Sequence, residues 1–258
     1  MSRNSVLRER FSDGKKKFAL LIDPDKYALS EIRGIAKSSE KAGVDFLFYG
    51  GSLVMENNHR KYISVLKEYC SAPVILFPGN QFMIPEDADG LLLLSLISGR
   101  NAEMLIGRHV VAAPFLKTCR FEILPTGYIL IENGHPTAVS YMSNTTPIPA
   151  GQDDIAMCTA VAGEFLGLQL IYMDAGSGAE NPVRLPMIKK VRQNITIPLI
   201  IGGGIRTAKQ AKEAAGAGAD VIVVGNAIEK KPSLIYELCD AVHSLNKKSK
   251  KSHLPGQL

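Results

Sequence analysis

The sequence lacks a membrane-spanning segment, because none of its apolar runs approaches the roughly 18 residues that a transmembrane helix needs. The longest run, residues 90–97, has the length of a buried strand. The N-terminus also lacks the apolar core of a secretory signal, since charged residues follow its first positions. These absences argue against an integral membrane protein and against secretion.

Cysteine and histidine are sparse and scattered. The four cysteines form no C-x-x-C pair, and the five histidines include no H-E-x-x-H motif. This pattern argues against a zinc site and indicates reduced thiols, as in a cytoplasmic protein. Any metal is therefore expected to be a hard, oxygen-liganded ion such as Mg²⁺.

Acidic residues are absent from the C-terminal end, where no Asp or Glu follows Asp240. The formal net charge of +5 comes mostly from four lysines in this tail, at 247, 248, 250 and 251. The rest of the chain is nearly neutral, so no nucleic-acid partner is expected. The lysine-rich tail, residues 246–258, is interpreted as a solvated extension that contacts an anionic membrane at most peripherally.

Strand and helix signals alternate along the chain, which is typical of an α/β protein with a parallel sheet. The 258 residues suit one (β/α)8 TIM barrel domain, residues 1–258, that ends in the tail. Strands are expected at residues 18–22, 44–49, 73–77, 90–95, 121–131, 168–173, 198–201 and 220–224. Helices are expected at residues 29–42, 59–69, 102–111, 153–166, 186–193, 208–217 and 233–245. Residues 80–90 are too few for a full helix and include Pro85, so the third helix is expected to be missing or replaced.

Three strands in the last third of the chain run directly into glycine. The glycines follow in residues 174–178, 202–204 and 225–226. Glycine at a strand end lets backbone N–H groups approach an anion, and the last two βα loops of such barrels commonly bind phosphate. We therefore predict a phosphate-binding cup. The alternative is that these glycines only form tight turns.

Polar residues at strand ends are the candidates for chemistry in a barrel. Asp174 ends the sixth strand beside the cup, where its carboxylate can accept a proton from a substrate hydroxyl; alternatively, it caps the following loop. Asp23 and Ser52 end the first two strands. One carboxylate and one hydroxyl suit Mg²⁺ together with phosphate oxygens and water, although Asp-Pro-Asp is also a common turn.

Five segments of the chain together resemble the geranylgeranylglyceryl phosphate synthase family. They are Leu20–Lys26, Tyr49–Ser52, Tyr172–Gly178, Ile201–Arg206 and Val223–Ala227. The resemblance implies a modified barrel whose third helix is replaced. It also implies a Mg²⁺-dependent prenyltransferase of ether-lipid biosynthesis, which joins sn-glycerol 1-phosphate to geranylgeranyl or a similar polyprenyl diphosphate.

The resemblance also implies roles for individual residues. Asp23 and Ser52 would hold Mg²⁺, and Asp174 would be the general base. The family's usual Tyr-Leu-Glu is Tyr-Met-Asp here, which keeps the carboxylate but shortens its side chain by one methylene. Glycerol 1-phosphate would be bound by Tyr172, Met173, Asp174, Ala175, Gly176, Ser177, Gly178, Gly203, Gly204, Gly225 and Asn226.

Three further expectations follow for the mouth of the barrel. Arg100 follows a strand and is a candidate to hold diphosphate, or else is merely solvated. The apolar stretch 139–142 predicts a homo-oligomer with Tyr141 near the interface, unless Tyr141 lines a prenyl groove. Candidates for that groove, each equally explained as barrel core, are Phe77, Leu93, Ile97, Pro114, Phe115 and Tyr128.

Two other functions fit parts of the pattern. A phosphosugar isomerase, lyase or cyclase would use the same cup, and a non-catalytic protein would bind phosphoglycerol or prenyl groups without turnover. An apolar tunnel beside the cup would favour prenyl transfer, whereas a closed polar pocket would favour the isomerase class.

Overall fold

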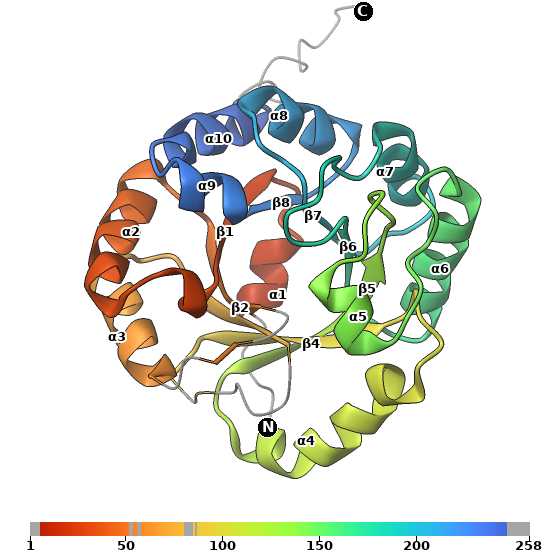
Figure 1. The fold of residues 1–258 in the computed structure, drawn as a ribbon, viewed down its shortest axis with the longest axis horizontal. Helices are drawn as coiled ribbons and strands as arrows, with labels where there is room; N and C mark the ends of the chain where they lie inside the picture. The colour runs from red at the N-terminus through yellow and green to blue at the C-terminus, as the bar shows by residue number, and fades with distance from the viewer. Residues whose placement is uncertain (1–5, 52–53, 56–57, 80–84, 86, 247–258) are drawn as a thin grey trace, which may run out of the picture.

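Eight parallel strands close into a barrel in the order of the chain, with β1 paired to both β2 and β8, in this computed structural model (Figure 1). The structure describes residues 6–51, 54–55, 58–79, 85 and 87–246. The predicted α/β barrel is confirmed. Its strands are β1 (Lys17–Ile22), β2 (Phe46–Gly51), β3 (Val74–Pro78), β4 (Gly90–Leu96), β5 (Glu122–Leu130), β6 (Leu170–Asp174), β7 (Leu199–Gly202) and β8 (Val221–Val224).

Helices form a ring around the strands (Figure 1). Of residues 79–89, which connect β3 to β4, the structure describes 79, 85 and 87–89, and none of these is helical, in agreement with the expected loss of the third helix. Within the described part of the chain, no helix has the length and apolar character needed to span a bilayer. The α-helices are α1 (Val6–Phe11), α2 (Leu29–Ala42), α3 (His59–Tyr69), α4 (Arg108–Thr118), α5 (Ala138–Ser143), α6 (Asp153–Phe165), α7 (Leu185–Arg192), α8 (Ala208–Ala217), α9 (Asn226–Lys230) and α10 (Leu234–His243). Two further turns are the 3₁₀ helix η1 (Pro24–Lys26) and the π-helix η2 (Glu103–Gly107), which continues into α4.

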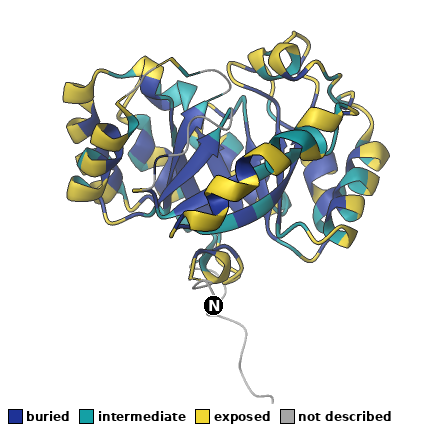
Figure 2. Cartoon of the chain, turned by 90° about the horizontal axis from the view of Figure 1, so that it is seen from below, coloured by how far each residue is buried: buried dark blue, intermediate teal, exposed yellow. Residues whose placement is uncertain are grey.

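The apolar core has two layers because successive side chains of a strand point to opposite faces. Phe46 and Phe48 of β2 point into the barrel, whereas Leu47 between them packs toward the helices. Figure 2 shows the same division, with buried strands at the centre and helices whose outer faces are exposed. Every strand therefore presents one set of side chains to the barrel interior and the other set to the helix ring.

Helix α1, which the sequence did not predict, closes the end of the barrel at which the strands begin. The ring of Phe11 stacks on that of Phe46, with centroids 4.3 Å apart, and Leu7 packs in the same inner layer. The carboxylate of Glu122, the first residue of β5, accepts hydrogen bonds from the backbone N–H groups of Leu7 and Arg8 at 2.8 and 3.0 Å. This floor leaves the opposite end, where the strands finish, as the open end.

Three aspartates tie neighbouring strands together at the floor. Each directly precedes an even-numbered strand, and its carboxylate accepts a hydrogen bond from a backbone N–H at the start of the strand before it. The pairs are Asp45 with Phe18, Asp89 with Val74 and Asp220 with Leu199, at 2.8, 2.8 and 2.9 Å. Since a carboxylate fixes which N–H lies opposite it, each pair sets the register of two strands.

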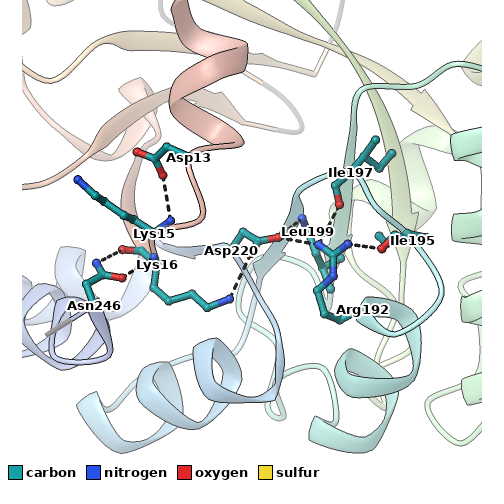
Figure 3. Close-up of polar contacts among 9 residues, drawn as sticks. All are labelled: Asp13, Lys15, Lys16, Arg192, Ile195, Ile197, Leu199, Asp220 and Asn246. Atoms are coloured by element: carbon teal, nitrogen blue, oxygen red, sulfur yellow. Dashed lines mark hydrogen bonds and ion pairs between the residues drawn. The ribbon is translucent and has the colours of Figure 1, made fainter. Parts of the chain in front are cut away.

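Asp220 has the most charged surroundings of the three (Figure 3). Its two oxygens pair with Lys16 at 3.1 Å and with Arg192 at 2.8 Å. The side chain of Asn246 forms two hydrogen bonds with the backbone of Lys16. It accepts one from the N–H at 2.7 Å and donates one to the carbonyl at 2.8 Å. The floor is thus held by polar contacts that join β1, β7, β8 and the residues after α10.

Candidate active site

The strand ends surround a polar cavity with a volume of about 470 Å³. Ten of the predicted site residues line it: Asp23, Tyr172, Asp174, Gly176, Ser177, Gly178, Gly203, Gly204, Gly225 and Asn226. The side chains of Met173 and Ala175 do not reach it, because the alternation along β6 turns them toward the helices, where both are buried. Ser52 lies outside the described residues.

Asp174 is the last residue of β6 and is only 7% exposed. Its Oδ1 accepts a hydrogen bond from the backbone N–H of Gly176 at 2.7 Å, and its Oδ2 accepts one from the hydroxyl of Tyr128 at 2.5 Å. Burial raises the pKa of this carboxyl, and the hydrogen bonds from Tyr128 and Gly176 offset only part of that rise. A buried carboxylate with a raised pKa is well suited to accept a proton.

Gly203 and Gly204 form a turn that residues with a side chain adopt only under strain. Their φ angles are +78° and +72°. A Cβ on Gly203 would lie 2.6 Å from Oδ1 of Asp174, and one on Gly204 would lie 2.7 Å from the backbone of Asn181. Among the described residues, neither backbone N–H has a hydrogen-bond acceptor. The backbone N–H groups of Gly203 and Gly204 are therefore free to bind an anion in the cavity. Only glycine leaves space for the anion at these two positions.

The loop after β6 contacts the start of α9 across the cavity. The side-chain amide of Asn226 donates to the hydroxyl of Ser177 at 3.2 Å. Gly225 precedes the first residue of α9, and the first N–H groups of a helix lack intrahelical acceptors. Arg206 holds the same loop by donating to the carbonyls of Ala179 and Glu180 at 2.5 and 2.9 Å. Three strand ends are thus joined into one cup.

Asp23 lies at the opposite side of the cup, after β1. One of its oxygens accepts a hydrogen bond from the N–H of Asp25 at 3.1 Å. Burial raises the pKa of Asp23, and it also raises that of Glu229, on which the charge of Asp23 acts in the same direction. A partly buried carboxylate that lines the cavity is a ligand that suits a hard ion such as Mg²⁺, so Asp23 fits the predicted metal. No group of three His, Cys, Asp or Glu residues suited to a metal occurs in the described parts of the chain.

A second, apolar pocket adjoins the polar cavity. The two share Gly51, Phe77 and Val139 in their walls. The apolar pocket runs along β4 and beneath α4, between the leucines of residues 91–96 and Ala112 and Leu116. A long apolar chain in this pocket would therefore reach the polar cavity at one end.

Three of the six residues expected to line a prenyl groove lie in the wall of the apolar pocket. Phe77, Leu93 and Tyr128 line the apolar pocket, whereas Ile97, Pro114 and Phe115 do not. Tyr141 is 84% exposed on α5 and does not line it either, although its neighbours Val139 and Met142 do. Arg100 faces neither pocket, because its guanidinium donates to carbonyls of its own loop, Ile97 to Gly99. The expectation that Arg100 holds diphosphate therefore has no support in the geometry.

Sequence reasoning missed the cations of the site and the partner of Asp174. Lys26, Arg206, Lys230 and Lys231 all line the polar cavity. Lys26 ends the motif Asp-Pro-Asp-Lys and Arg206 follows Gly-Gly-Gly-Ile, so the sequence carried a signal for both. Tyr128 was expected only as an apolar wall, because no sequence signal links it to a carboxylate 46 positions away.

Comparison with known proteins gives a consistent result. The sequence profile of the PcrB family matches residues 9–243. Geranylgeranylglyceryl phosphate synthase of Chitinophaga pinensis is 52% identical over 92% of this chain and 94% of its own length, and that of Methanosphaera stadtmanae is 37% identical over 94% and 100%. The crystal structure of (S)-3-O-geranylgeranylglyceryl phosphate synthase from Thermoplasma acidophilum in complex with substrate sn-glycerol-1-phosphate superposes with a TM-score of 0.86. It is 32% identical, over 95% of this chain and all of the other.

The glycine turn after β7 gives a first prediction. Gly204→Ala should lower the affinity for inorganic phosphate by about tenfold or more, because a left-handed alanine costs ~1–2 kcal/mol and its Cβ would meet backbone atoms. Isothermal titration calorimetry measures the effect. Gly216→Ala in α8, where a Cβ would meet nothing within 4 Å, is the matched control. Unchanged phosphate binding by a folded Gly204→Ala protein would contradict the cup.

Proposed function

Since this chain belongs to the PcrB family, we propose that it is a glycerol 1-phosphate prenyltransferase of ether-lipid biosynthesis. It forms an ether bond between sn-glycerol 1-phosphate and geranylgeranyl or a similar polyprenyl diphosphate and releases diphosphate. The named relatives and the glycerol 1-phosphate complex of the Thermoplasma acidophilum enzyme support this function.

The observation that carries the proposal is the junction of the two pockets. A polar cavity lined by glycine turns and cations suits a phosphate, and the apolar pocket that shares Gly51, Phe77 and Val139 with it suits a prenyl chain. An isomerase, lyase or cyclase of small phosphosugars has no use for the second pocket. A non-catalytic binding protein has no use for a buried carboxylate at the junction. Both alternatives are therefore less well supported.

The chain's residues supply binding, orientation and a base. We propose that the turns at Gly176–Gly178, Gly203–Gly204 and Gly225–Asn226 hold the phosphate, with Tyr172 as the wall beside it. Fixing the phosphate aims the C3 hydroxyl toward the apolar pocket, which lowers the entropic part of the barrier. The hydroxyl oxygen forms its bond to C1 of the prenyl chain as the bond from C1 to diphosphate breaks. Asp174 is the acceptor of the hydroxyl proton.

Mg²⁺ is the proposed cofactor, held by Asp23 and Ser52. When bound, such an ion neutralises charge on the departing diphosphate. The support in this structure is that Asp23 lines the polar cavity close to Gly51, where the apolar pocket begins, so its carboxylate lies near the expected position of the diphosphate. Lys26, which lines the same cavity, adds a positive charge on that side.

We further propose that the protein acts in the cytoplasm as a homo-oligomer. Exposed apolar side chains gather on η2 and α4, where Ile106, Val110 and Val111 are 60%, 65% and 67% exposed, and Tyr141 stands out from α5. Large apolar patches that are exposed on a protein surface mark sites of protein contact. The lysine-rich tail, most of which lies outside the described residues, would contact a membrane at most peripherally.

The test of function and of Asp174 is one assay. Purified protein with labelled sn-glycerol 1-phosphate, Mg²⁺ and a series of prenyl diphosphates should yield the ether product, resolved by chain length. Asp174→Asn should lower turnover by about 10²–10⁴-fold, since the amide cannot accept the proton, while calorimetry shows glycerol 1-phosphate binding nearly unchanged. Asp154→Asn, on the exposed side of α6, is the control. Near wild-type turnover in Asp174→Asn would remove this residue from the mechanism.

The same base determines the pH dependence. The carboxylate must be ionised to accept a proton, so activity is lost as the pH falls through its pKa. Because burial raises the pKa of Asp174, the acid limb of the rate profile should lie at higher pH than an ordinary aspartate would give.

Another prediction concerns the metal. Asp23→Ala should raise the Mg²⁺ concentration needed for half-maximal rate and weaken Mn²⁺ binding measured by electron paramagnetic resonance, with glycerol 1-phosphate affinity unchanged. Asp25→Ala removes a neighbouring carboxylate that does not line the polar cavity and serves as the control. If glycerol 1-phosphate affinity collapsed in Asp23→Ala, Asp23 would belong to the acceptor site.

A last prediction for the proposed function concerns assembly. Light scattering should show wild-type particles larger than a monomer and a smaller particle for Tyr141→Ala, because the substitution removes a large exposed ring from the proposed interface. An unchanged particle mass together with an altered preference for prenyl chain length would place Tyr141 in the groove instead.

A further inference from the structure

Tyr128 of β5 lines the apolar pocket and is hydrogen-bonded to a residue of the polar cavity. Its side chain lines the apolar pocket, is only 4% exposed, and carries its hydroxyl to Asp174, which lines the polar cavity. Edge-on packing fixes the ring between Phe77 and Tyr172, with centroid distances of 6.0 and 5.4 Å. The hydroxyl therefore has a defined position at the boundary between the two pockets.

The two oxygens of Asp174 face different sides of that boundary. Oδ1 accepts from the N–H of Gly176 and lies next to Gly203, so it is on the side of the phosphate cup. Oδ2 is bonded to Tyr128, so it is on the side of the apolar pocket. The prenyl carbon arrives from the apolar side, which means that the acceptor hydroxyl must lose its proton beside Oδ2 and Tyr128.

Oδ2 already accepts a 2.5 Å hydrogen bond from the hydroxyl of Tyr128, and Asp174 is almost fully buried. The phenol oxygen still has lone pairs with which to accept a hydrogen bond. A hydroxyl that approaches from the boundary therefore meets the oxygen of Tyr128 as a ready acceptor, linked in one step to the carboxylate.

Building on the proposed function, we infer that Tyr128 is a catalytic residue that relays the proton of the acceptor hydroxyl to Asp174. As the ether bond forms and the bond from C1 to diphosphate breaks, the hydroxyl proton moves to the oxygen of Tyr128. In the same step the proton of Tyr128 moves to Oδ2 of Asp174. Tyrosine is neutral before and after the step, and Asp174 ends protonated.

The environment favours a concerted transfer over a free tyrosinate. Burial, together with the negative charge of Asp174, raises the pKa of Tyr128 well above its usual value, so the phenol does not ionise by itself. It can pass a proton on only while it receives one. This requirement couples deprotonation of the hydroxyl to the arrival of the prenyl carbon.

Tyr128→Phe tests the relay because it removes the hydroxyl and keeps the ring in the apolar wall. Single-turnover rates with both substrates saturating should fall by about 10²–10⁴-fold, with the Kd for glycerol 1-phosphate and for prenyl diphosphate each within a few fold of wild type. Tyr62→Phe removes another buried hydroxyl, one that donates to the carbonyl of Tyr27 away from the site, and should leave the rate unchanged.

A proton inventory distinguishes a relay from a merely structural role. Single-turnover rates in mixtures of light and heavy water should curve for the wild type, as two moving protons require, and should not curve for Tyr128→Phe. A linear wild-type inventory, or a Tyr128→Phe rate within about threefold of wild type, would overturn the relay and leave direct transfer to Asp174. Absence of ether product from the wild-type protein would instead refute the proposed function, so the two failures are distinguishable.

Discussion

The register of the parallel barrel is the constraint on which the site depends. Asp45, Asp89 and Asp220 fix it at the floor, each by accepting a hydrogen bond from the start of the neighbouring strand. A shift of one residue would exchange the two faces of a strand, since side chains alternate. In β6 such a shift would turn Asp174 toward the helices and Met173 into the cavity. The aspartates fix three strand pairs of the barrel, and the pairing of β6 with β5 and β7 sets its own register, which places Asp174 in the cavity.

The buried carboxylate of Asp174, at the open end of the barrel, is stabilised in its charged form by its hydrogen-bond donors. Taking a charge out of water is costly unless hydrogen bonds replace its hydration. Asp174 receives one such bond from the loop that follows β6 and one from Tyr128. The first ties the carboxylate to the phosphate cup and the second to the apolar wall. The same two contacts that stabilise the charge therefore also align the two halves of the site.

Much of the fold could be predicted because long amphipathic helices and buried strands have strong periodic signals. Helices α2, α3 and α8 begin and end where the sequence predicted. The short helices α1, α5 and α9 were missed, since five or six residues are too few to show a period. The helix after β4 was expected to end at residue 111, yet α4 follows directly on the π-helix η2 and continues through Pro114 to Thr118.

Some features of the candidate site also have a local sequence signal, and others do not. The glycine turns could be predicted because their residue types are dictated by local backbone geometry. The outward orientation of Met173 and Ala175 follows from strand alternation, but only once the first and last residues of β6 are known. The pairing of Tyr128 with Asp174 depends on the register of β5 against β6, where Tyr128 lies opposite Tyr172. A contact set by register between strands far apart in sequence leaves no local signal.

The apolar pocket between β4 and α4 has a consequence for what the barrel can accommodate. Here Leu91 and Leu93 of β4 lie in the same apolar cluster as Ala112 and Leu116 of α4, and all four residues also line the apolar pocket. The pocket between β4 and α4 therefore gives this barrel room for a hydrocarbon chain along its side, in addition to the cavity at its mouth.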